Sequence, residues 1–537
     1  MGQILPIKGL SDVGVVTDID PASLPISAYT RAKNVRFDEG AVVRSPVFRT
    51  VKASLGFNPR FVYGVNPITG YSTVVIATDT YVIQEYSNGS LTDRSGSISA
   101  TSANELVWTG TTLANIIYLN RSDKVPSYKA IGGTNLAALT NWDSNWRCES
   151  LRSYGDFLIG LNMTESSTNY GTRVRWSNIA TANAIPDSWD ATDTTKSAGF
   201  NDLVQMQSPI IDGATLGTNF IIYSKTDVYM MEFVGGTFIF NFRKIFSDIG
   251  IINQNCAIEI DSKHYVFADS DIYVHDGNSR QSIVDQRVKN YIFGGLDTSK
   301  TNICFVTRHP ELEEVYFCYH SGDDMAEFTS STKCNRAAVY NYKNNTWSFL
   351  DLPNVSSATI ANVNSSSTYA TTTASYEAIG GSYWSQQANF DTHCIFVGQD
   401  NSTDGITSDK MYGLDLSDAG SLSFALDSEA TKAPFLERTG IDLDEISTVT
   451  GYKVINKIYP QITTSNSNKA FAFNFGAADL IENSPNYEST VTYTTSTDHK
   501  IDSRAAGRYL SYKLTTTDNK DFSFIGFDMD MLTTGRR

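Results

Sequence analysis

Cysteine and histidine side chains are the first candidates for chemistry, because thiolates and imidazoles ligate metals and serve as catalytic groups. Cys318 and His320 alternate, so a strand would place both on one face, with Cys304 and His309 nearby in sequence. A zinc site needs about four converging ligands at CxxC or HxxxH spacing, which the sequence lacks. We therefore expect core side chains and no metal. The full set is Cys148, Cys256, Cys304, Cys318, Cys334, Cys394, His264, His275, His309, His320, His393 and His499.

Carboxylates offer two further candidates. The stretch DNSTDG, residues 400–405, copies the first half of an EF-hand loop, but its twelfth position holds Met411 where calcium needs a bidentate Glu. We interpret it as a turn stabilised by Asx side chains. Asp528 and Asp530 could form a glycosidase-like pair, yet their alternation in FDMDML predicts that both face solvent from one strand.

Motifs for nucleophilic or phosphate chemistry are also missing from the sequence. It contains no GxSxG elbow, no Walker loop, no GxGxxG after an apolar strand and no SxDxGxxW repeat. We expect neither an enzyme nor a cofactor, and we single out no catalytic, cofactor-binding or metal-binding residue.

The composition indicates which elements would position any site. The 537 residues are 41% hydrophobic, 12% aromatic and only 19% charged. Ser, Thr, Asn and Gly are plentiful, which favours strands and turns over helices, so we predict an all-β protein. The net charge of −16 is dispersed and no basic stripe occurs, so sequence-specific nucleic-acid binding is not expected.

The cysteines and the N-terminus indicate a compartment. Six scattered cysteines are too few for a disulfide scaffold, and several lie in apolar runs, which predicts buried free thiols in a reducing environment. The start, MGQILPIKGL, lacks a signal-peptide pattern, and no apolar run approaches the ~18 residues of a membrane span. We expect a protein that is made in the cytoplasm without stable membrane insertion.

A repeated hairpin dominates the chain. In RAAVYNYKNNTWSFLDLP, residues 336–353, Tyr340 and Trp347 flank a tight turn. Similar meanders with Asx-Gly or Gly-Gly corners recur. The seven copies lie at 72–95, 115–129, 156–178, 218–245, 263–284, 313–349 (with an insertion at 321–335) and 393–424.

A meander of this size cannot bury both of its faces alone, whereas several packed around an axis bury them all. We therefore predict a β-propeller of six to eight blades over residues 51–429, with one or two generic β-sandwiches as the alternative. The segment 1–50 is predicted to be an arm packed on the rest. Polar β runs at 430–537 predict a second, β-sandwich-like domain.

One stretch, QSIVDQRVKNYIF at 281–293, breaks the β pattern. Its apolar residues follow a helical period, which predicts a short amphipathic helix packed on the blades. A helix that docks a partner is the alternative.

Several blocks, taken together and in order, resemble the nozzle proteins, or tail tubular protein B, of short-tailed bacteriophages. None of them is a chemical motif, so the resemblance rests on their combination. The blocks are GVVTDIDPASLPISAYTRAKNVRFDEGAVVRSP (14–46), RVRWSNIATANAIPDSWD with AGFNDL, IIYSKTDVYMMEFVGGTFIFNFRKIFSDIGI through IYVHDG, HPELEEVYFCYHS, AAVYNYKNNTWSFLDLP, and GRYLSYKL through FIGFDMDMLTTGRR.

The resemblance implies a structural virion protein: a homo-hexamer that extends the DNA channel below the portal and its tail adaptor, with fibres or spikes attached around it. Six copies would carry 6 × −16 = −96 charges, and an acidic lumen would repel DNA phosphates and let the genome slide. We hypothesise such a lumen. Neutralising its carboxylates should slow genome ejection, and an unchanged ejection rate would contradict the idea. The alternative function is a receptor- or glycan-binding propeller, in which Trp142 and Trp146 would stack on sugars, although we expect both to pack in the core or between blade faces.

Overall fold

The computed structural model describes residues 3–65, 73–87, 89–236, 238–363, 392–416, 424–443, 451–465, 469–516 and 518–534. Over these ranges the protein is all-β, as predicted, and its described helices are short. They are α1 (Lys289–Gly295) and the 3-10 helices η1 (Pro21–Ser23), η2 (Thr298–Ile303) and η4 (Ser402–Asp404).

Five sheets are antiparallel meanders of four strands that follow the chain in order. Their apolar residues pack between neighbouring sheets, as Phe61, Trp108 and Leu119 do between the first two. The strands are β8 (Pro59–Val65), β9 (Thr73–Thr78), β10 (Ile83–Ser87) and β11 (Ser90–Asp93); β12 (Trp108–Leu113), β13 (Ile116–Arg121), β14 (Ser127–Ala130) and β15 (Ala137–Ala138); β16 (Trp146–Tyr154), β17 (Phe157–Glu165), β18 (Thr168–Trp176) and β19 (Gly199–Asp202); β20 (Ile210–Leu216), β21 (Asn219–Ser224), β22 (Asp227–Phe233) and β23 (Phe240–Ser247); β24 (Ala257–Ile260), β25 (Lys263–Phe267), β26 (Ile272–His275) and β27 (Arg280–Ser282).

A nine-stranded sheet contains two further groups of four strands. The 17-residue strand β31 pairs with β30 along its first half and with β32 along its second half, with a register shift between Val355 and Ser357. The order is β28-β29-β30-β31-β32-β33-β7, so the last group takes its outer strand from near the N-terminus. The strands are β28 (Phe305–His309), β29 (Glu314–Tyr319), β30 (Cys334–Asn341), β31 (Thr346–Asn362), β32 (Thr392–Gly398), β33 (Lys410–Asp415), β7 (Val47–Lys52), β2 (Gly14–Val15) and β3 (Ala28–Tyr29).

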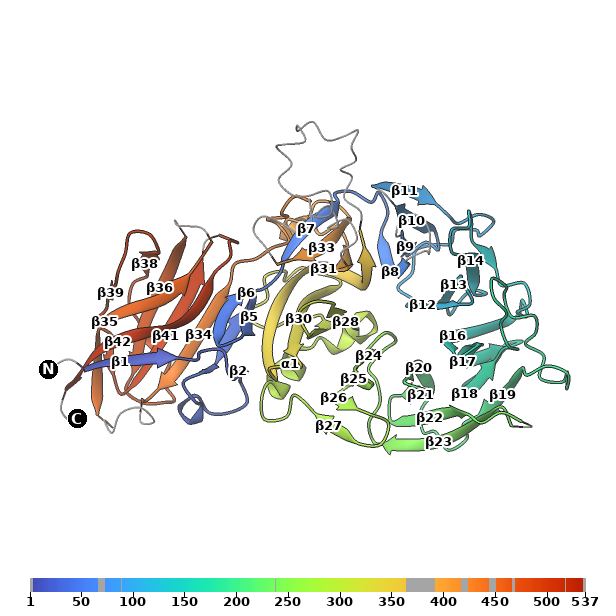
Figure 1. Ribbon diagram of the computed structural model, residues 1–537, viewed down its shortest axis with the longest axis horizontal. Helices are drawn as coiled ribbons and strands as arrows, with labels where there is room; N and C mark the ends of the chain where they lie inside the picture. Colours follow the sequence, from blue (N-terminus) through green and yellow to red (C-terminus); the bar gives the residue numbers. More distant parts are fainter. Residues whose placement is uncertain are drawn as a thin grey trace, which may run out of the picture.

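The seven groups stand around a common centre (Figure 1). Seven inner strands contact one another in sequence, and the last of them, β31, contacts the first, β8. Among the described strands no sheet closes on itself, so the circle is made by side-chain packing between separate sheets. The inner strands are β8, β12, β16, β20, β24, β28 and β31.

Gly64 marks where the first and last groups meet. A Cβ atom there would lie 2.4 Å from Ile360 O and 2.9 Å from Ala361 Cβ, so only glycine lets β8 approach β31 this closely. We expect Gly64→Ala to lower the free energy of unfolding by ~1–3 kcal/mol, as measured by urea denaturation. Gly294→Ala in α1 is the control, since no atom lies within 4 Å of its Cβ position; equal effects of the two changes would contradict the close approach.

The hairpin of residues 336–353 forms as predicted. Tyr340 pairs with Trp347 across β30 and β31, with ring centroids 4.9 Å apart. Asn345 takes the left-handed turn conformation (φ 55°) and accepts a hydrogen bond from the Tyr340 hydroxyl. Each of the other six meanders likewise supplies strands to one group of the circle.

The helix predicted at 281–293 is wrong over its first half. Residues 280–282 form β27, and a turn follows in which Gln286 has φ 56°, a left-handed conformation that interrupts any helix. Only α1, from Lys289, is helical. Val284, Val288 and Ile292 are nevertheless buried, because the turn also directs its apolar side chains into the core.

Two more sheets pack on each other beside the circle (Figure 1). Ring pairs join them, including Phe473 with Phe524 and Tyr512 with Phe527. One sheet holds β1 (Gln3–Lys8), β5 (Val35–Asp38), β6 (Ala41–Arg44), β35 (Tyr452–Thr463), β39 (Ile501–Asp502), β40 (Ala506–Gly507) and β42 (Ser523–Thr534); the other holds β4 (Arg31–Lys33), β34 (Phe435–Ile441), β36 (Ala470–Ala478), β37 (Asn486–Tyr487), β38 (Val491–Thr494) and β41 (Tyr509–Thr516).

The N-terminal 52 residues take part in both regions. Strands β1, β4, β5 and β6 complete the two packed sheets, whereas β2, β3 and β7 belong to the nine-stranded sheet of the circle. Strands β1 and β42, the first and last along the chain, lie in the region of the two packed sheets (Figure 1). The segment for which the sequence predicts a packed arm therefore contributes strands to both packed sheets and to the nine-stranded sheet.

Candidate functional site

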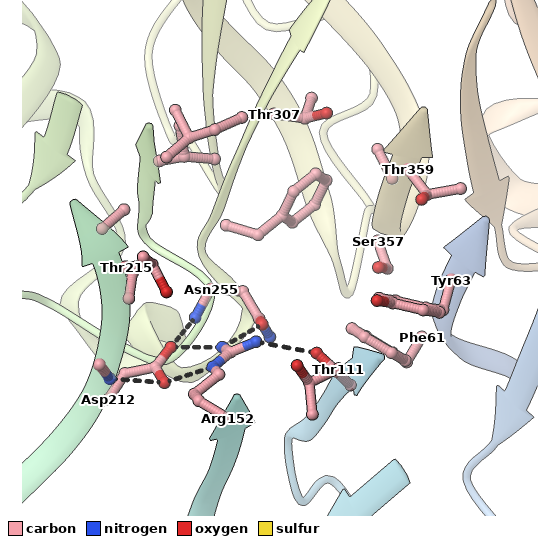
Figure 2. Close-up of a pocket in the computed structure, with 18 of the residues that line it drawn as sticks. Phe61, Tyr63, Thr111, Arg152, Asp212, Thr215, Asn255, Thr307, Ser357 and Thr359 are labelled. Carbon is pink, nitrogen blue, oxygen red and sulfur yellow. Dashed lines mark hydrogen bonds and ion pairs between the residues drawn. The ribbon is translucent and has the colours of Figure 1, made fainter. Parts of the chain in front are cut away.

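The centre of the circle holds a cavity of about 440 Å³ lined by residues of all seven inner strands (Figure 2). Meander topology explains this, because each group presents its innermost strand to the axis. The polar lining residues are Tyr63, Thr111, Arg152, Ser153, Asp212, Thr215, Tyr223, Asn255, Thr307, Ser357 and Thr359.

An ion pair spans neighbouring groups at one side of the cavity. Arg152 on β16 donates from Nε and Nη2 to both carboxylate oxygens of Asp212 on β20, at 2.8 and 2.5 Å. Arg152 also donates to Asn255 Oδ1 (2.8 Å) and to Gly110 O (3.2 Å). Asp212 accepts further bonds from Ser150 Oγ and Asn255 N. We call this network the Arg152–Asp212 clamp; it joins β12, β16, β20 and the approach to β24.

The clamp is electrostatically neutral and stable in its charged form. Burial opposes the charge of Asp212, yet Arg152 and the bonds from Ser150 and Asn255 outweigh it and lower the pKa of the carboxyl. Burial likewise opposes the charge of Arg152, but Asp212 raises the pKa of the guanidinium. These two are the only charged residues among those that line the cavity, so the lining carries no net charge.

An aromatic pair and a set of hydroxyls form the opposite wall. The rings of Phe61 and Tyr63 stack with centroids 6.4 Å apart, and Gly110 leaves them room, since a Cβ there would lie 3.0 Å from Phe61. Ser357 Oγ and Thr359 Oγ1 accept bonds from the backbone N–H groups of Val62 and Gly64. The wall is thus partly apolar and partly hydroxylated.

A buried relay of hydrogen bonds joins the group of β20 to the group of β24. Gly277 N donates to His275 Nδ1, so His275 carries its proton on Nε2 and donates it to the Tyr223 hydroxyl, 2.6 Å away. Tyr223 in turn donates to His264 Nδ1 (2.6 Å), and His264 Nε2 donates to Thr215 O (2.7 Å). The two bonds accepted at Nδ1, by His275 from Gly277 N and by His264 from the Tyr223 hydroxyl, require neutral imidazoles.

The relay predicts acid sensitivity. Burial and the neighbouring His264 lower the pKa of His275 to about 3, and burial lowers the pKa of His264 as well. An unfolded chain exposes these imidazoles at an ordinary pKa of about 6.5. Below that pH the unfolded chain therefore binds protons that the folded chain does not bind. Stability is therefore full above about pH 6.5 and falls as the pH drops toward 3.

We expect His275 alone to remove about 2 kcal/mol of unfolding free energy between about pH 7 and pH 5. Urea denaturation across that interval measures the loss. The variant His275→Asn should start less stable and show a shallower pH dependence; a slope equal to that of the unchanged protein would contradict the neutral relay.

Several hydroxyls that line the cavity already have hydrogen-bond partners inside the protein. The Thr111 hydroxyl bonds that of Ser153 at 2.7 Å, and the Tyr223 hydroxyl bonds the neutral imidazoles of His264 and His275. The one carboxylate, Asp212, is held by Arg152. Among the described residues, no group of three or more His, Cys, Asp or Glu side chains could hold a metal ion.

The cysteines and histidines lie elsewhere. All six cysteines are buried and free, which confirms the prediction of buried thiols. His309 is buried and accepts from Glu311 N, while His320 Nε2 lies 2.8 Å from Ser331 O. His393 is buried on β32 and Cys304 accepts a bond at its carbonyl from the Cys256 thiol. The interpretation of these residues as core side chains is confirmed for all but the exposed His499.

The carboxylate candidates adopt the structures that the sequence favours. Residues 400–405 form a turn around η4 in which Asn401 bonds the Asp404 carboxylate and Gly405 has φ 90°. Asp528 and Asp530 share the half-buried face of β42 and alternate with buried neighbours such as Met529.

Of the two tryptophans weighed as sugar-stacking residues, Trp142 lies in the core and Trp146 is half-buried against it. Trp142 is 4% exposed, donates to Trp146 O and packs edge-on against Trp189. Sequence reasoning did not single out the Arg152–Asp212 clamp or the Tyr223 relay. The available signal was a charged residue that interrupts an apolar strand, as Asp212 does after Ile210 and Ile211.

Comparisons with known proteins add little. No family model and no curated protein matches the chain. Among solved structures, the chain is similar to one described as the structure of U3-55K, with a TM-score of 0.39 and 9% identity over 68% of this chain and 98% of that one. Because the TM-score is below 0.5, we conclude nothing about this chain from the similarity. Within the described part of the chain, no helix is long and apolar enough to cross a membrane.

Proposed function

We propose that the seven groups of strands are the blades of a seven-bladed β-propeller and that the two packed sheets are a β-sandwich. The succession of inner strands, with β31 touching β8, supports this proposal. In this fold β7 is the outer strand of the last blade, so the N-terminus closes a circle that the rest of the chain builds. Such a closure protects the edges of the first and last blades.

On this fold we propose the function that the resemblance implies: a structural part of a short phage tail, the nozzle through which DNA leaves. The observation that supports it best is the N-terminal segment, which contributes strands to both regions. Because one segment contributes strands to both regions, the circle and the two packed sheets resist motion relative to each other, as a load-bearing tube requires.

Buried ion pairs reinforce the joint between the two regions. Arg36 on β5 donates to Glu314 on β29 at 2.6 Å, with side chains 7% and 3% exposed. Lys33 on β4 lies 3.3 Å from Asp351, and Asn34 donates to the same carboxylate at 2.8 Å. Buried charges tolerate little displacement, because separating them leaves each one unpaired in a low-dielectric interior.

The size of the central cavity constrains where DNA would pass. A space of about 440 Å³, with the Arg152–Asp212 clamp across one side, cannot admit a duplex whose major groove alone is ~12 Å wide. The duplex would therefore pass between copies of the chain, around an axis outside each propeller. This fits the expectation of a homo-hexamer attached to a tail adaptor.

The oligomeric state tests the proposal. We expect the purified chain, mixed with the portal–adaptor complex of the same virion, to add six copies, or 6 × 59.1 = 354.6 kDa, in native mass measurement. Addition of another number of copies, or failure to bind the complex, would contradict a nozzle. Saturable binding of the isolated chain to cell-surface glycans without any such assembly would favour the alternative, a receptor-binding propeller.

A further inference from the structure

We propose that the central cavity binds a neutral, polyhydroxylated small molecule of the mono- or disaccharide class. The inference does not depend on the nozzle function, because it follows from the charge, hydrogen-bonding groups and volume of the cavity alone.

Charge excludes the ionic ligands. Arg152 would attract an anion, but its guanidinium N–H groups already donate to Asp212, Asn255 and Gly110. Asp212 would attract a cation, but Arg152 occupies both of its oxygens. A charged ligand would therefore find neither member of the clamp free, and breaking the buried pair is costly.

Hydroxyl groups supply the directional contacts. Since Ser357 and Thr359 accept bonds from β8, their own protons can point into the cavity, and no acceptor for those protons lies among the described residues. Thr307, between them and β24 around the circle (Figure 2), has only a weak contact, 3.9 Å, with Cys394 Sγ. Three hydroxyl-bearing residues of the inner strands β28 and β31 thus line the part of the cavity where a sugar could offer acceptor oxygens.

The remaining wall suits the apolar face of such a ligand. The stacked rings of Phe61 and Tyr63 present aromatic surface between the hydroxyls and the clamp (Figure 2). Sites that combine aromatic lining with a few placed polar groups are typical for small ligands, and their volumes of ~300–1,000 Å³ bracket the volume found here. The cavity therefore has room for one or two sugar rings.

Ligand titration of the full chain tests the inference. The probes are D-glucose and maltose, with D-glucuronate and glucose 6-phosphate as charged counterparts, each followed by calorimetry and saturation-transfer NMR up to ~20 mM. We expect saturable binding of a neutral sugar with Kd on the order of 1 mM or tighter, and at least about tenfold weaker binding of its charged counterpart.

Variants locate the binding. Thr307→Val removes a hydroxyl with almost no other bond and should weaken sugar binding by about tenfold. Thr359→Val should weaken binding equally, whereas Thr359→Ser keeps the hydroxyl and should bind the sugar as tightly as the unchanged protein. Thr492→Val on the exposed face of β38 is the matched control and should change nothing. No saturable binding of either neutral sugar, tighter binding of the charged probes, or indifference to both valine variants would overturn the proposal.

Discussion

Replacing Arg152 with methionine should lower the free energy of unfolding by ~3–5 kcal/mol, because it leaves the Asp212 carboxylate buried without its counter-charge. Asp212 is 4% exposed, so water cannot replace the lost guanidinium. The change also breaks the bonds to Gly110 and Asn255 that tie β16 to β12 and to the segment before β24. Urea denaturation, followed by tryptophan fluorescence, measures the effect.

Two comparisons separate the clamp from a general effect of removing charge. Lys196→Met breaks a surface pair with Asp187 and should change stability far less than Arg152→Met does. Adding Asp212→Leu to Arg152→Met should not restore stability, because Ser150 and the backbone N–H of Asn255 then lose their acceptor. Equal stability of Arg152→Met and the unchanged protein would show that the clamp does not hold the circle.

Replacing Trp347 with alanine should cost a similar ~3–5 kcal/mol, since a fully buried indole leaves a large cavity. Trp347 is 0% exposed and packs on Tyr340, and its Nε1 donates to Ile283 O at 2.9 Å. Trp347 also pairs with Gly14 of the N-terminal segment. The two backbones approach closely, since a Cβ atom on Gly14 would lie 3.0 Å from Trp347 N. The residue therefore joins the hairpin, the β27–α1 turn and the N-terminal segment.

Thermal and urea unfolding of three variants would check this role. Trp347→Phe keeps most of the ring but leaves Ile283 O without its donor, so we expect an intermediate loss of ~1–3 kcal/mol. Phe238→Ala removes an aromatic that is 79% exposed and should change stability by no more than ~0.5 kcal/mol. A Trp347→Ala protein as stable as Phe238→Ala would contradict the hairpin's place in the core.

The sequence predicted the repeating elements better than it predicted how they join. Hairpins such as that of Tyr340 and Trp347 depend on local signals, aromatic runs and turn residues, which a single stretch displays. The pairing of β7 with β33 depends on contacts across more than 350 residues, and the sharing of β31 by two groups depends on its pairing with β32 after a register shift. No local pattern encodes them, and the helix at 281–293 failed because one residue, Gln286, adopts φ > 0.

The candidate site could not be predicted from the sequence because it also depends on contacts between residues far apart in the chain. Arg152 and Asp212 stand 60 residues apart, and each is an ordinary charged residue until β16 and β20 meet at the axis. The hydroxyls of Thr307 and Thr359 are equally ordinary in a chain rich in threonine. Sequence reasoning did identify the residues without a special role, since Cys318 and Trp142 belong to the core.

The central claim, that this protein is a segment of a tube, is tested most directly by cryo-electron microscopy of the chain bound to its portal–adaptor complex, viewed along the axis. The account predicts a sixfold ring in which each copy shows its own small propeller, with the open channel between the copies. A ring of another symmetry, or a channel that runs through the centre of a single copy, would contradict it.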